Sequence, residues 1–252
     1  MHAAVAHTRP FVLFDLDGTL VRPGSGLQRA HMGAMREAVA ELCDGVEDFR
    51  YADGDLWYRE TNLSGFTDAG TIAAMLRIHG APDSDAMVAE AIDLMLRRLG
   101  GHLDLMEPGS YVDEGLPGAT ELVRNVHAAG IAAGLSTGNA REVASWKVDR
   151  LGLTAVLRTG GFGDSARDRR LLVAHGAAAF GAPSANGLVI GDTVDDIRAA
   201  HANSLPCLAV ATGAYAVEEL RAAGADLVVP NLTHEDTLPM ITDFIGLGSL
   251  QR

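Results

Sequence analysis

The chain has 252 residues, of which 48% are hydrophobic, and a formal net charge of -13 from 20 basic and 33 acidic residues. This length and composition exclude a disordered chain and predict one substantial core, either in a single domain or in a domain that carries an insertion. The negative charge repels phosphate backbones, so we expect no nucleic-acid partner, although a metal ion or an arginine can still attract a small anion into a cleft.

Neither the cysteines nor the N-terminal residues indicate export or membrane insertion. Cys43 and Cys207 are far apart and form no Cys-x-x-Cys motif, so we expect neither a disulfide framework nor a zinc site. The first residues lack a basic region followed by a long apolar stretch, and no segment reaches the ~20 apolar residues of a membrane span. We therefore expect a soluble, unprocessed cytoplasmic protein with no membrane partner.

The first predicted element is a short buried strand that ends in two carboxylates. Phe11 to Phe14 form an apolar run, and Asp15-Leu16-Asp17-Gly18-Thr19-Leu20 follows at once. Charges at the end of a buried strand are costly unless they bind something, and open α/β sheets place their ligands at the carboxyl ends of strands. This pair therefore marks a candidate active site.

Residues 21–115 are predicted to form an all-helical insertion, or cap domain. Apolar residues recur at helical spacing over 29–42, 71–78 and 84–99, and we see no strand-like segment. The insertion leaves the chain after the first strand and returns near Pro117. Two linkers, residues 21–26 and 111–116, are therefore expected to act as its hinges.

From Pro117 onward, helix-like and strand-like segments alternate, as in a series of βαβ units. The predicted strands are short, continuously apolar runs, typical of a parallel sheet with helices on both faces. They are residues 131–137, 188–191, 207–211 and 226–229. The predicted helices are residues 118–129, 140–151, 169–180, 194–202, 217–223 and 234–244. The fold class is thus α/β, a doubly wound, Rossmann-like parallel sheet formed by residues 1–20 and 116–252.

Two later strands also end in polar residues, in Leu135-Ser136-Thr137-Gly138-Asn139 and in Gly191-Asp192-Thr193-Val194-Asp195-Asp196. Parallel strands gather their carboxyl ends at one edge, so we expect four carboxylates to converge: Asp15, Asp17, Asp192 and Asp196. Such a cluster cannot stay fully ionised without a cation, and oxygen ligands of this kind suit Mg²⁺. The sequence therefore predicts a magnesium site.

These groups can carry out phosphoryl transfer. Asp15 is the candidate nucleophile, which would form an aspartyl phosphate, and Asp17 is the candidate acid and base for the leaving group and for water. The Thr137 hydroxyl and the Gly138 amide stand where a helix begins, a position that favours phosphoryl oxygens, and Asn139 is expected to be the N-cap.

A cation should balance the transferring phosphate, and the sequence offers several. The only lysine, Lys147, lies two turns along its predicted helix, and we expect it to be structural. Arg167, Arg169 and Arg170 cluster where the next helix begins, and Arg169 is favoured.

At these residues the chain resembles the haloacid dehalogenase superfamily of phosphohydrolases. Residues 15–20 look like its first motif, Thr137 its second and residues 191–196 its fourth, whereas its third motif is usually Lys and this chain has Ser165-Ala166-Arg167-Asp168-Arg169-Arg170. The insertion looks like the cap of the phosphoglycolate phosphatase and phosphoglucomutase branch. The presence of Asp17 disfavours dehalogenation, because members that dehalogenate lack the second acid.

The resemblance implies a role for each acid. Asp15 is nucleophile and metal ligand, Asp17 is the acid/base and a ligand through its carbonyl, and Asp192 is a ligand that Asp196 supports. Phe66, Thr67 and Asp68 in the insertion face the active site in relatives with similar turns, but capping of the helix near Thr71 explains them equally well.

The implied function is hydrolysis of a small phosphorylated metabolite, and three alternatives remain. A phosphomutase would use the same groups. A serine esterase would use Ser136 in Gly-x-Ser-x-Gly with Asp192 and His201, and a receiver-like switch would hold phosphate on Asp15. The sequence does not name the metabolite, because the insertion contains arginines that could bind a second anion. They are Arg22, Arg29, Arg36, Arg50, Arg59 and Arg77.

Overall fold

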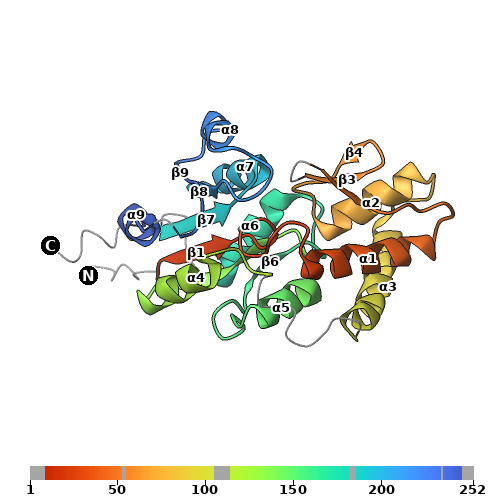
Figure 1. Ribbon diagram of the computed structural model, residues 1–252, viewed down its shortest axis with the longest axis horizontal. Coiled ribbons are helices and arrows are strands. Elements are labelled where there is room, and N and C mark those ends of the chain that lie inside the picture. The colour runs from red at the N-terminus through yellow and green to blue at the C-terminus, as the bar shows by residue number, and fades with distance from the viewer. Residues whose placement is uncertain (1–8, 53–54, 105–113, 182–185, 234, 246–252) are drawn as a thin grey trace, which may run out of the picture.

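The computed structural model describes residues 9–52, 55–104, 114–181, 186–233 and 235–245. Its larger part is a six-stranded sheet in the order β6-β5-β1-β7-β8-β9, in which all neighbouring strands run parallel (Figure 1). The strands are β1 (Phe11–Phe14), β5 (Ala132–Thr137), β6 (Gly160–Phe162), β7 (Gly187–Gly191), β8 (Cys207–Val210) and β9 (Leu227–Val229). The prediction of a doubly wound parallel sheet is confirmed.

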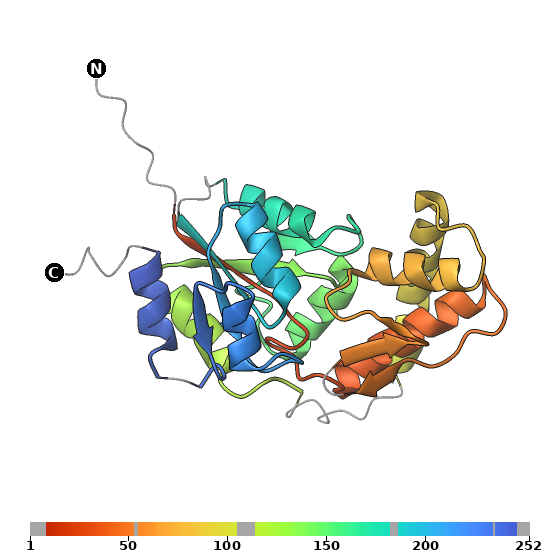
Figure 2. The same ribbon diagram turned by 90° about the horizontal axis from the view of Figure 1, so that it is seen from above.

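Helices cover both faces of this sheet because its strands are apolar on both sides. In β1, Phe11 and Leu13 belong to one buried cluster and Val12 and Phe14 to the other. The first cluster includes α6 (Arg169–Ala179), α7 (Val194–Ala202) and α8 (Val217–Ala222). The second includes α4 (Ala119–Ala128), α5 (Arg141–Arg150) and α9 (Thr237–Phe244). Figure 2 shows α6 and α7 on one side of the sheet and α4 and α9 on the other. The period of two along each strand thus sorts its side chains between two cores.

The edge strand β6 was not predicted, because its glycines give no strand-like sequence pattern. It consists of Gly160, Gly161 and Phe162, and glycine is a poor strand former. A Cβ on Gly161 would lie 1.9 Å from the carbonyl oxygen of Leu172 in α6. The glycine is therefore required by the close approach of α6 to the sheet, which is a tertiary constraint.

The described residues of the insertion, 21–52, 55–104 and 114–115, form three helices and a small sheet. The helices are α1 (Gly26–Ala40), α2 (Asp68–Ile78) and α3 (Asp85–Asp104), and the antiparallel strands are β2 (Arg50–Ala52), β3 (Asp55–Tyr58) and β4 (Thr61–Asn62). The expectation of an all-helical insertion is therefore wrong. These strands have two to four residues, too few for a visible alternation, and Arg59 at the β3–β4 turn adopts a φ of 50° without the usual glycine.

The two linkers of the insertion lie side by side. Val21 forms β-bridges with Asp17 and with Gly115, and the Arg22 amide donates to the Glu114 carbonyl at 2.8 Å. The Leu27 amide at the start of α1 donates to Glu114 Oε2 at 3.1 Å. Residues 111–113 of the second predicted hinge lie outside the described residues.

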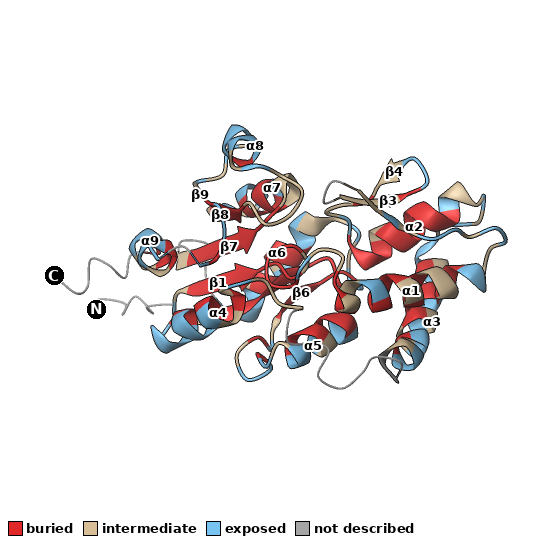
Figure 3. Cartoon of the chain, in the orientation of Figure 1, coloured by how far each residue is buried: buried red, intermediate tan, exposed pale blue. Residues whose placement is uncertain are grey.

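The insertion has its own apolar core, which meets the large sheet at α5. Met35, Tyr58 and Met75 are wholly buried in it, and Val143 of α5 and Ala140, the N-cap of that helix, belong to the same cluster. Figure 3 shows buried residues along the strands and on the inner faces of the helices. Among the described residues, no helix combines the length and the apolar character that crossing a membrane would require.

Candidate active site

The register of the strands brings the two acidic segments, residues 15–17 and 192–196, close together. β1 lies between β5 and β7, with Phe14 paired to Leu135 on one side and to Ile190 on the other. Asp15 follows Phe14 directly, and its amide donates to the Ile190 carbonyl at 2.8 Å. Carboxylate oxygens of the buried residues Asp15, Asp192 and Asp196 all lie within 4.8 Å of one another. The side chain of Asp17 is not part of this trio.

Neighbouring backbone leaves little room around Asp192. The Thr19 hydroxyl donates to Asp192 Oδ1 at 3.0 Å. A Cβ on Gly18 or on Gly213 would lie 2.3 Å or 1.8 Å from Asp192 Oδ2, and Gly18 also has a φ of +92°. The glycine after Asp17 is thus required both by its backbone conformation and by the carboxylate beside it.

Asp196 is held in the first turn of α7. It forms a capping box with Thr193, whose amide and hydroxyl donate to Asp196 Oδ2 at 3.1 and 2.7 Å. Its other oxygen, Oδ1, accepts from Arg169 Nε at 2.8 Å. Both oxygens of Asp196 therefore have protein partners.

Arg169 is the cation of the trio. Its Nη2 lies 2.6 Å from Asp15 Oδ1 and 2.6 Å from Asp196 Oδ1, and its Nη1 donates to the Gly65 carbonyl of the insertion at 3.2 Å. Burial by itself would lower the pKa of this guanidinium, but the charges of Asp15, Asp196 and Asp192 outweigh burial and raise it. Arg167 and Arg170 form exposed ion pairs with Asp85 and Asp168 instead.

The trio carries more negative charge than Arg169 neutralises. Burial raises the pKa of Asp15 to about 7 against the opposing charge of Arg169, with Asp196 and Asp17 adding to the rise. Burial, followed by the charges of Asp15 and Asp196, also raises the pKa of Asp192 well above its usual value. Carboxylates that are buried together in this way are relieved by a divalent cation with oxygen ligands. The donor set therefore fits such an ion.

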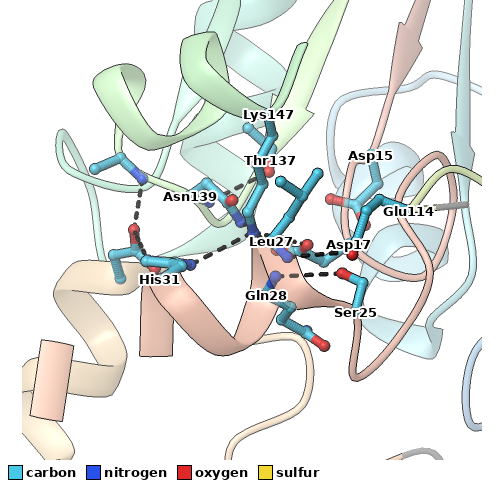
Figure 4. A network of polar contacts seen from close by, with 12 residues as sticks. Asp15, Asp17, Ser25, Leu27, Gln28, His31, Glu114, Thr137, Asn139 and Lys147 are labelled. Carbon is cyan, nitrogen blue, oxygen red and sulfur yellow. Dashed lines mark hydrogen bonds and ion pairs between the residues drawn. The ribbon is translucent and has the colours of Figure 1, made fainter. Parts of the chain in front are cut away.

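Asp17 points away from the trio, toward a second cation (Figure 4). Lys147 Nζ lies 2.7 and 2.6 Å from its two carboxylate oxygens, and Asn139 Nδ2 donates to Oδ2 at 2.8 Å. Burial would raise the pKa of Asp17, but the charges of Lys147 and His31 and these hydrogen bonds outweigh burial and lower it. The two acids of the first motif thus have separate surroundings, one shared with acids and one with a lysine.

Lys147 is the main site residue that the sequence interpretation missed. We expected a structural role, but its side chain is wholly buried and ion-paired to Asp17. The buried face of α5 consists of Val143, Ala144, Lys147 and Val148. A lysine within the apolar stripe of a helix was the available signal, because a buried ammonium group needs an anionic partner.

The insertion extends this polar network. His31 Nδ1 lies 3.5 Å from Lys147 Nζ, and His31 Nε2 lies 3.0 Å from Asp68 Oδ2 (Figure 4). The same Asp68 oxygen accepts from the Ala140 amide at 2.6 Å. Asp68 of α2 therefore caps α5, whose own N-cap, Ala140, offers no side-chain acceptor. The expectation that Asn139 caps this helix is wrong, because Asn139 turns to Asp17.

The second motif lies directly under the insertion. Thr137 is wholly buried, and its Oγ1 accepts from the Asn139 amide at 3.2 Å. The Gly138 carbonyl accepts from the Asp68 amide at 2.7 Å, and a Cβ on Gly138 would lie 2.5 Å from the Phe66 carbonyl oxygen. Gly138 thus allows the two backbones to touch.

Residues 66–68 combine both of the roles that the sequence left open. Thr67 caps α2, because its hydroxyl accepts from the Gly70 amide at 3.0 Å. Phe66 and Asp68 line the cavity beside Asp15 and Asp17, although the Phe66 residue as a whole is 44% exposed. One residue of the segment therefore caps its own helix and the other two border the site.

The groups required by a serine esterase are not together. Ser136 Oγ is buried and has no hydrogen-bond partner among the described residues. His201 pairs with Asp226 at 2.9 Å and borders a pocket with Gly187, the first residue of β7, whereas Ser136 is near the end of β5. In a parallel sheet the start of one strand and the end of another lie at opposite ends of the sheet.

Solved structures with the same architecture include one titled a predicted phosphatase and one titled a β-phosphoglucomutase. A predicted phosphatase from Clostridium acetobutylicum has 18% identity and a TM-score of 0.65, covering 93% of this chain and 99% of its own. A β-phosphoglucomutase from Clostridium difficile has 16% identity and a TM-score of 0.68, covering 96% and 100%. CbbY from Rhodobacter sphaeroides, in complex with phosphate, has 20% identity and a TM-score of 0.64, covering 90% and 96%. At these identities the likeness establishes the fold.

The family follows from the sequence itself. The profile of the haloacid dehalogenase-like hydrolases matches residues 11–203, which include all three acidic or polar strand ends. The chain therefore belongs to the haloacid dehalogenase-like hydrolases, and the expectation of a hydrolytic enzyme of this superfamily is confirmed. No curated protein matches the chain in sequence.

Proposed function

We propose that the protein is a Mg²⁺-dependent phosphatase that hydrolyses a small phosphorylated metabolite through an aspartyl phosphate on Asp15. The observation that carries this proposal is the separation of the two acids of the first motif. Asp15 lies in a buried acid trio with Arg169, whereas Asp17, two residues later, is bound by Lys147 and Asn139. The surroundings of Asp15 thus suit a nucleophile that attacks a charged phosphoryl group. Those of Asp17 suit a group that gives and accepts a proton.

The residues would act in two steps. Asp15 forms a bond to phosphorus as the bond to the leaving oxygen breaks, and Asp17 gives that oxygen a proton. Water then attacks the acyl phosphate, Asp17 accepts a proton from it, and Asp15 is released. Contact with Lys147 keeps Asp17 ionised, which is its form in the second step. An arriving phosphoryl dianion raises the pKa of Asp17, which favours its protonated form in the first step.

Other residues would hold the phosphoryl group and the ion. The proposed phosphoryl ligands are Arg169, the Thr137 hydroxyl, the Gly138 amide and Asn139. Asp15, Asp192 and the Asp17 carbonyl are the proposed Mg²⁺ ligands, with Asp196 supporting them through its contact with Arg169. Bound there, the ion would supply positive charge that offsets the phosphoryl oxygens and the carboxylate trio.

We further propose that residues 1–20 and 116–252 form the catalytic core and residues 21–115 the cap. This division is supported by two apolar clusters, one along the large sheet and one within the insertion, and by the paired linkers at Val21 and Gly115. A cap of this kind would exclude water until the aspartyl phosphate forms. The two free cysteines support a cytoplasmic location.

Phosphate-ester chemistry is also supported by the ligands of a structural neighbour. CbbY from Rhodobacter sphaeroides was solved with phosphate, and a variant of it with xylulose-1,5-bisphosphate. The likeness to β-phosphoglucomutases keeps a phosphomutase as the second candidate. The two differ in whether water or a substrate hydroxyl takes the phosphoryl group from Asp15.

The test is phosphate release from phosphorylated sugars, acids and polyols, with Mg²⁺ or with a chelator. We expect Mg²⁺-dependent release, and Asp15→Asn to reduce kcat/KM by roughly 10⁴-fold or more. Asp195→Asn is the control, because Asp195 is a neighbouring surface acid that pairs with Arg198.

Four outcomes would contradict the proposal. Activity that resists chelation but is lost to a serine-reactive phosphonate indicates the esterase. Stable phosphorylation of Asp15 without turnover indicates a switch. Transfer of phosphate to a second position of a sugar indicates the mutase. Full activity of Asp15→Asn excludes Asp15 as the nucleophile.

A further inference from the structure

Permanent positive charge borders the cavity above the proposed catalytic acids on the sheet side only. The cavity has a volume of about 100 Å³ and is bordered on the sheet side by Asp15, Asp17, Arg169 and Asp192. On the other side the insertion contributes Gln28, His31, Met32, Tyr51, Leu63 and Ser64, together with one carboxylate, Asp68. Asp68 is already paired with His31 and with the Ala140 amide. A leaving group that extends toward the insertion therefore meets neutral polar and apolar groups and a carboxylate that has its own partners.

The arginines of the insertion do not border this cavity. Arg36 is ion-paired with Asp48, Arg59 with Glu47, and Arg77 with Asp83. Arg50 lies over the Trp57 ring, and Arg29 donates to the Gly24 carbonyl. On the sheet side, Arg169 and Lys147 are already paired with carboxylates. The charge of Arg29 does reach Tyr51, where it opposes the rise of the Tyr51 pKa, but Arg29 does not border the cavity. A second anionic group on the substrate would thus meet the Asp68 carboxylate and no bordering arginine of the insertion.

Tyr51 offers an unused hydrogen bond inside the cavity. Its hydroxyl is buried and has no partner among the described residues, and the side-chain oxygen of Asn139 in the same cavity is also unpartnered. Tyr51 borders the same cavity as Asp17, and burial, followed by the charge of Asp17, raises the pKa of Tyr51 against the charge of Arg29. Buried polar atoms are rarely left unpaired, and a ligand hydroxyl would satisfy both.

We propose that the substrate is the monophosphate of a small uncharged polyhydroxy alcohol, and that Tyr51 selects it by a hydrogen bond to a hydroxyl of the leaving group. This inference rests on the proposed phosphatase function. A leaving group with hydroxyls can form hydrogen bonds with the Tyr51 hydroxyl and the Asn139 side-chain oxygen. A leaving group without hydroxyls leaves both of these buried atoms without a partner. A leaving group with a carboxylate or a second phosphate brings an uncompensated charge into the cavity. Tyr51 is thus a specificity-determining residue.

Three compounds of similar length test this selection. Glycerol 1-phosphate carries two free hydroxyls, propyl phosphate carries none, and 3-phosphoglycerate replaces the terminal alcohol by a carboxylate. We expect kcat/KM for glycerol 1-phosphate to exceed that for each of the other two by roughly 10-fold or more. Equal values for glycerol 1-phosphate and propyl phosphate, or a preference for 3-phosphoglycerate, would overturn the inference.

Tyr51→Phe removes the hydroxyl and keeps the ring. It should lower kcat/KM for glycerol 1-phosphate by roughly 10-fold and leave propyl phosphate within about 3-fold, so that the preference collapses. Tyr58→Phe is the matched control, because Tyr58 stands on the next strand of the same small sheet with its hydroxyl 2.6 Å from His79 Nε2. It should keep the preference of the unmodified protein. A preference that survives in Tyr51→Phe would overturn the assignment of Tyr51.

Failure of this inference is distinct from failure of the proposed function. Without phosphatase activity, none of the three compounds releases phosphate, and neither does acetyl phosphate, whose leaving group needs no protonation. With phosphatase activity but a different selectivity, the compounds do release phosphate, but their kcat/KM values rank differently from the order expected above. A preference for 3-phosphoglycerate that disappears in Arg29→Ala would assign the insertion's selectivity to Arg29 instead.

Discussion

The sheet side and the insertion side of the cavity differ in how they use charge. On the sheet side, the acids are compensated by cations, because Arg169 is paired with the buried Asp15 and the buried Lys147 is paired with Asp17. On the insertion side, the one carboxylate, Asp68, is paired with His31, and the Tyr51 hydroxyl has no partner among the described residues. The comparison teaches that the carboxyl ends of the sheet strands hold the charged groups that must lie close to one another. The insertion supplies the groups that distinguish one substrate from another.

The two sides meet through His31 and Asp68. His31 reaches Lys147, and Asp68 receives the Ala140 amide at the start of α5. These contacts tie the position of the insertion to the lysine that holds Asp17. The division between the two sides can be tested by changing one charge at a time.

Beyond loss of the nucleophile, the largest effect is expected at Arg169. Replacing it by methionine removes the cation that contacts Asp15 and Asp196. We expect kcat/KM to fall by about 10²- to 10³-fold for every phosphate ester, because a positioned charge at the transferring group is lost. Arg167→Met changes an exposed ion pair and should stay within about 2-fold. Steady-state kinetics on both variants checks this, and equal losses would remove Arg169 from the site.

A smaller effect is expected at Lys147. Lys147→Met removes the main partner of Asp17, so we expect kcat to fall by roughly 10- to 100-fold with KM within about 3-fold. The loss should be large for alkyl phosphates and small for acetyl phosphate, whose leaving group needs no proton. A loss of the same size for both would show that Lys147 supports the fold rather than Asp17. Lys147→Arg tests whether charge alone restores the rate.

The smallest predicted effect is on thermal stability. Asp15 and Asp192 have raised pKa values in the folded protein, so between about pH 4 and pH 7 the folded state binds more protons than the unfolded state. Without a divalent ion, stability should therefore fall as pH rises through this window. At pH 8, Mg²⁺ should raise Tm by a few degrees, through binding to the folded state alone.

Asp192→Asn sharpens the same measurement. It keeps an acceptor for Thr19 and removes one negative charge from the trio. Its metal-free Tm at pH 8 should exceed that of the unmodified protein, and its response to Mg²⁺ should be lost. A Tm that rises equally with Mg²⁺ in both proteins would place the ion elsewhere.

Local sequence patterns determined the sheet and the edge at which the site forms. Strands that are apolar on both faces require helices on both sides, and parallel strands end at a common edge. The carboxyl ends of β1, β5 and β7 therefore lie at the same end of the sheet, and Asp15, Thr137 and Asp192 could be predicted to lie there from their positions after Phe14, Leu135 and Ile190. Periodicity also located α1, α2 and α3 to within a few residues at most ends.

Tertiary packing decided the partners of these residues. β6 and the short strands of the insertion carry too few side chains for a period to be seen, and Gly161 is explained only by the approach of α6. Asp68 caps a helix 72 residues away, and Lys147 is 130 residues from Asp17. A buried charge takes whichever opposite charge the packed chain brings within reach, and that distance is set by the assembled fold, not by spacing along the sequence.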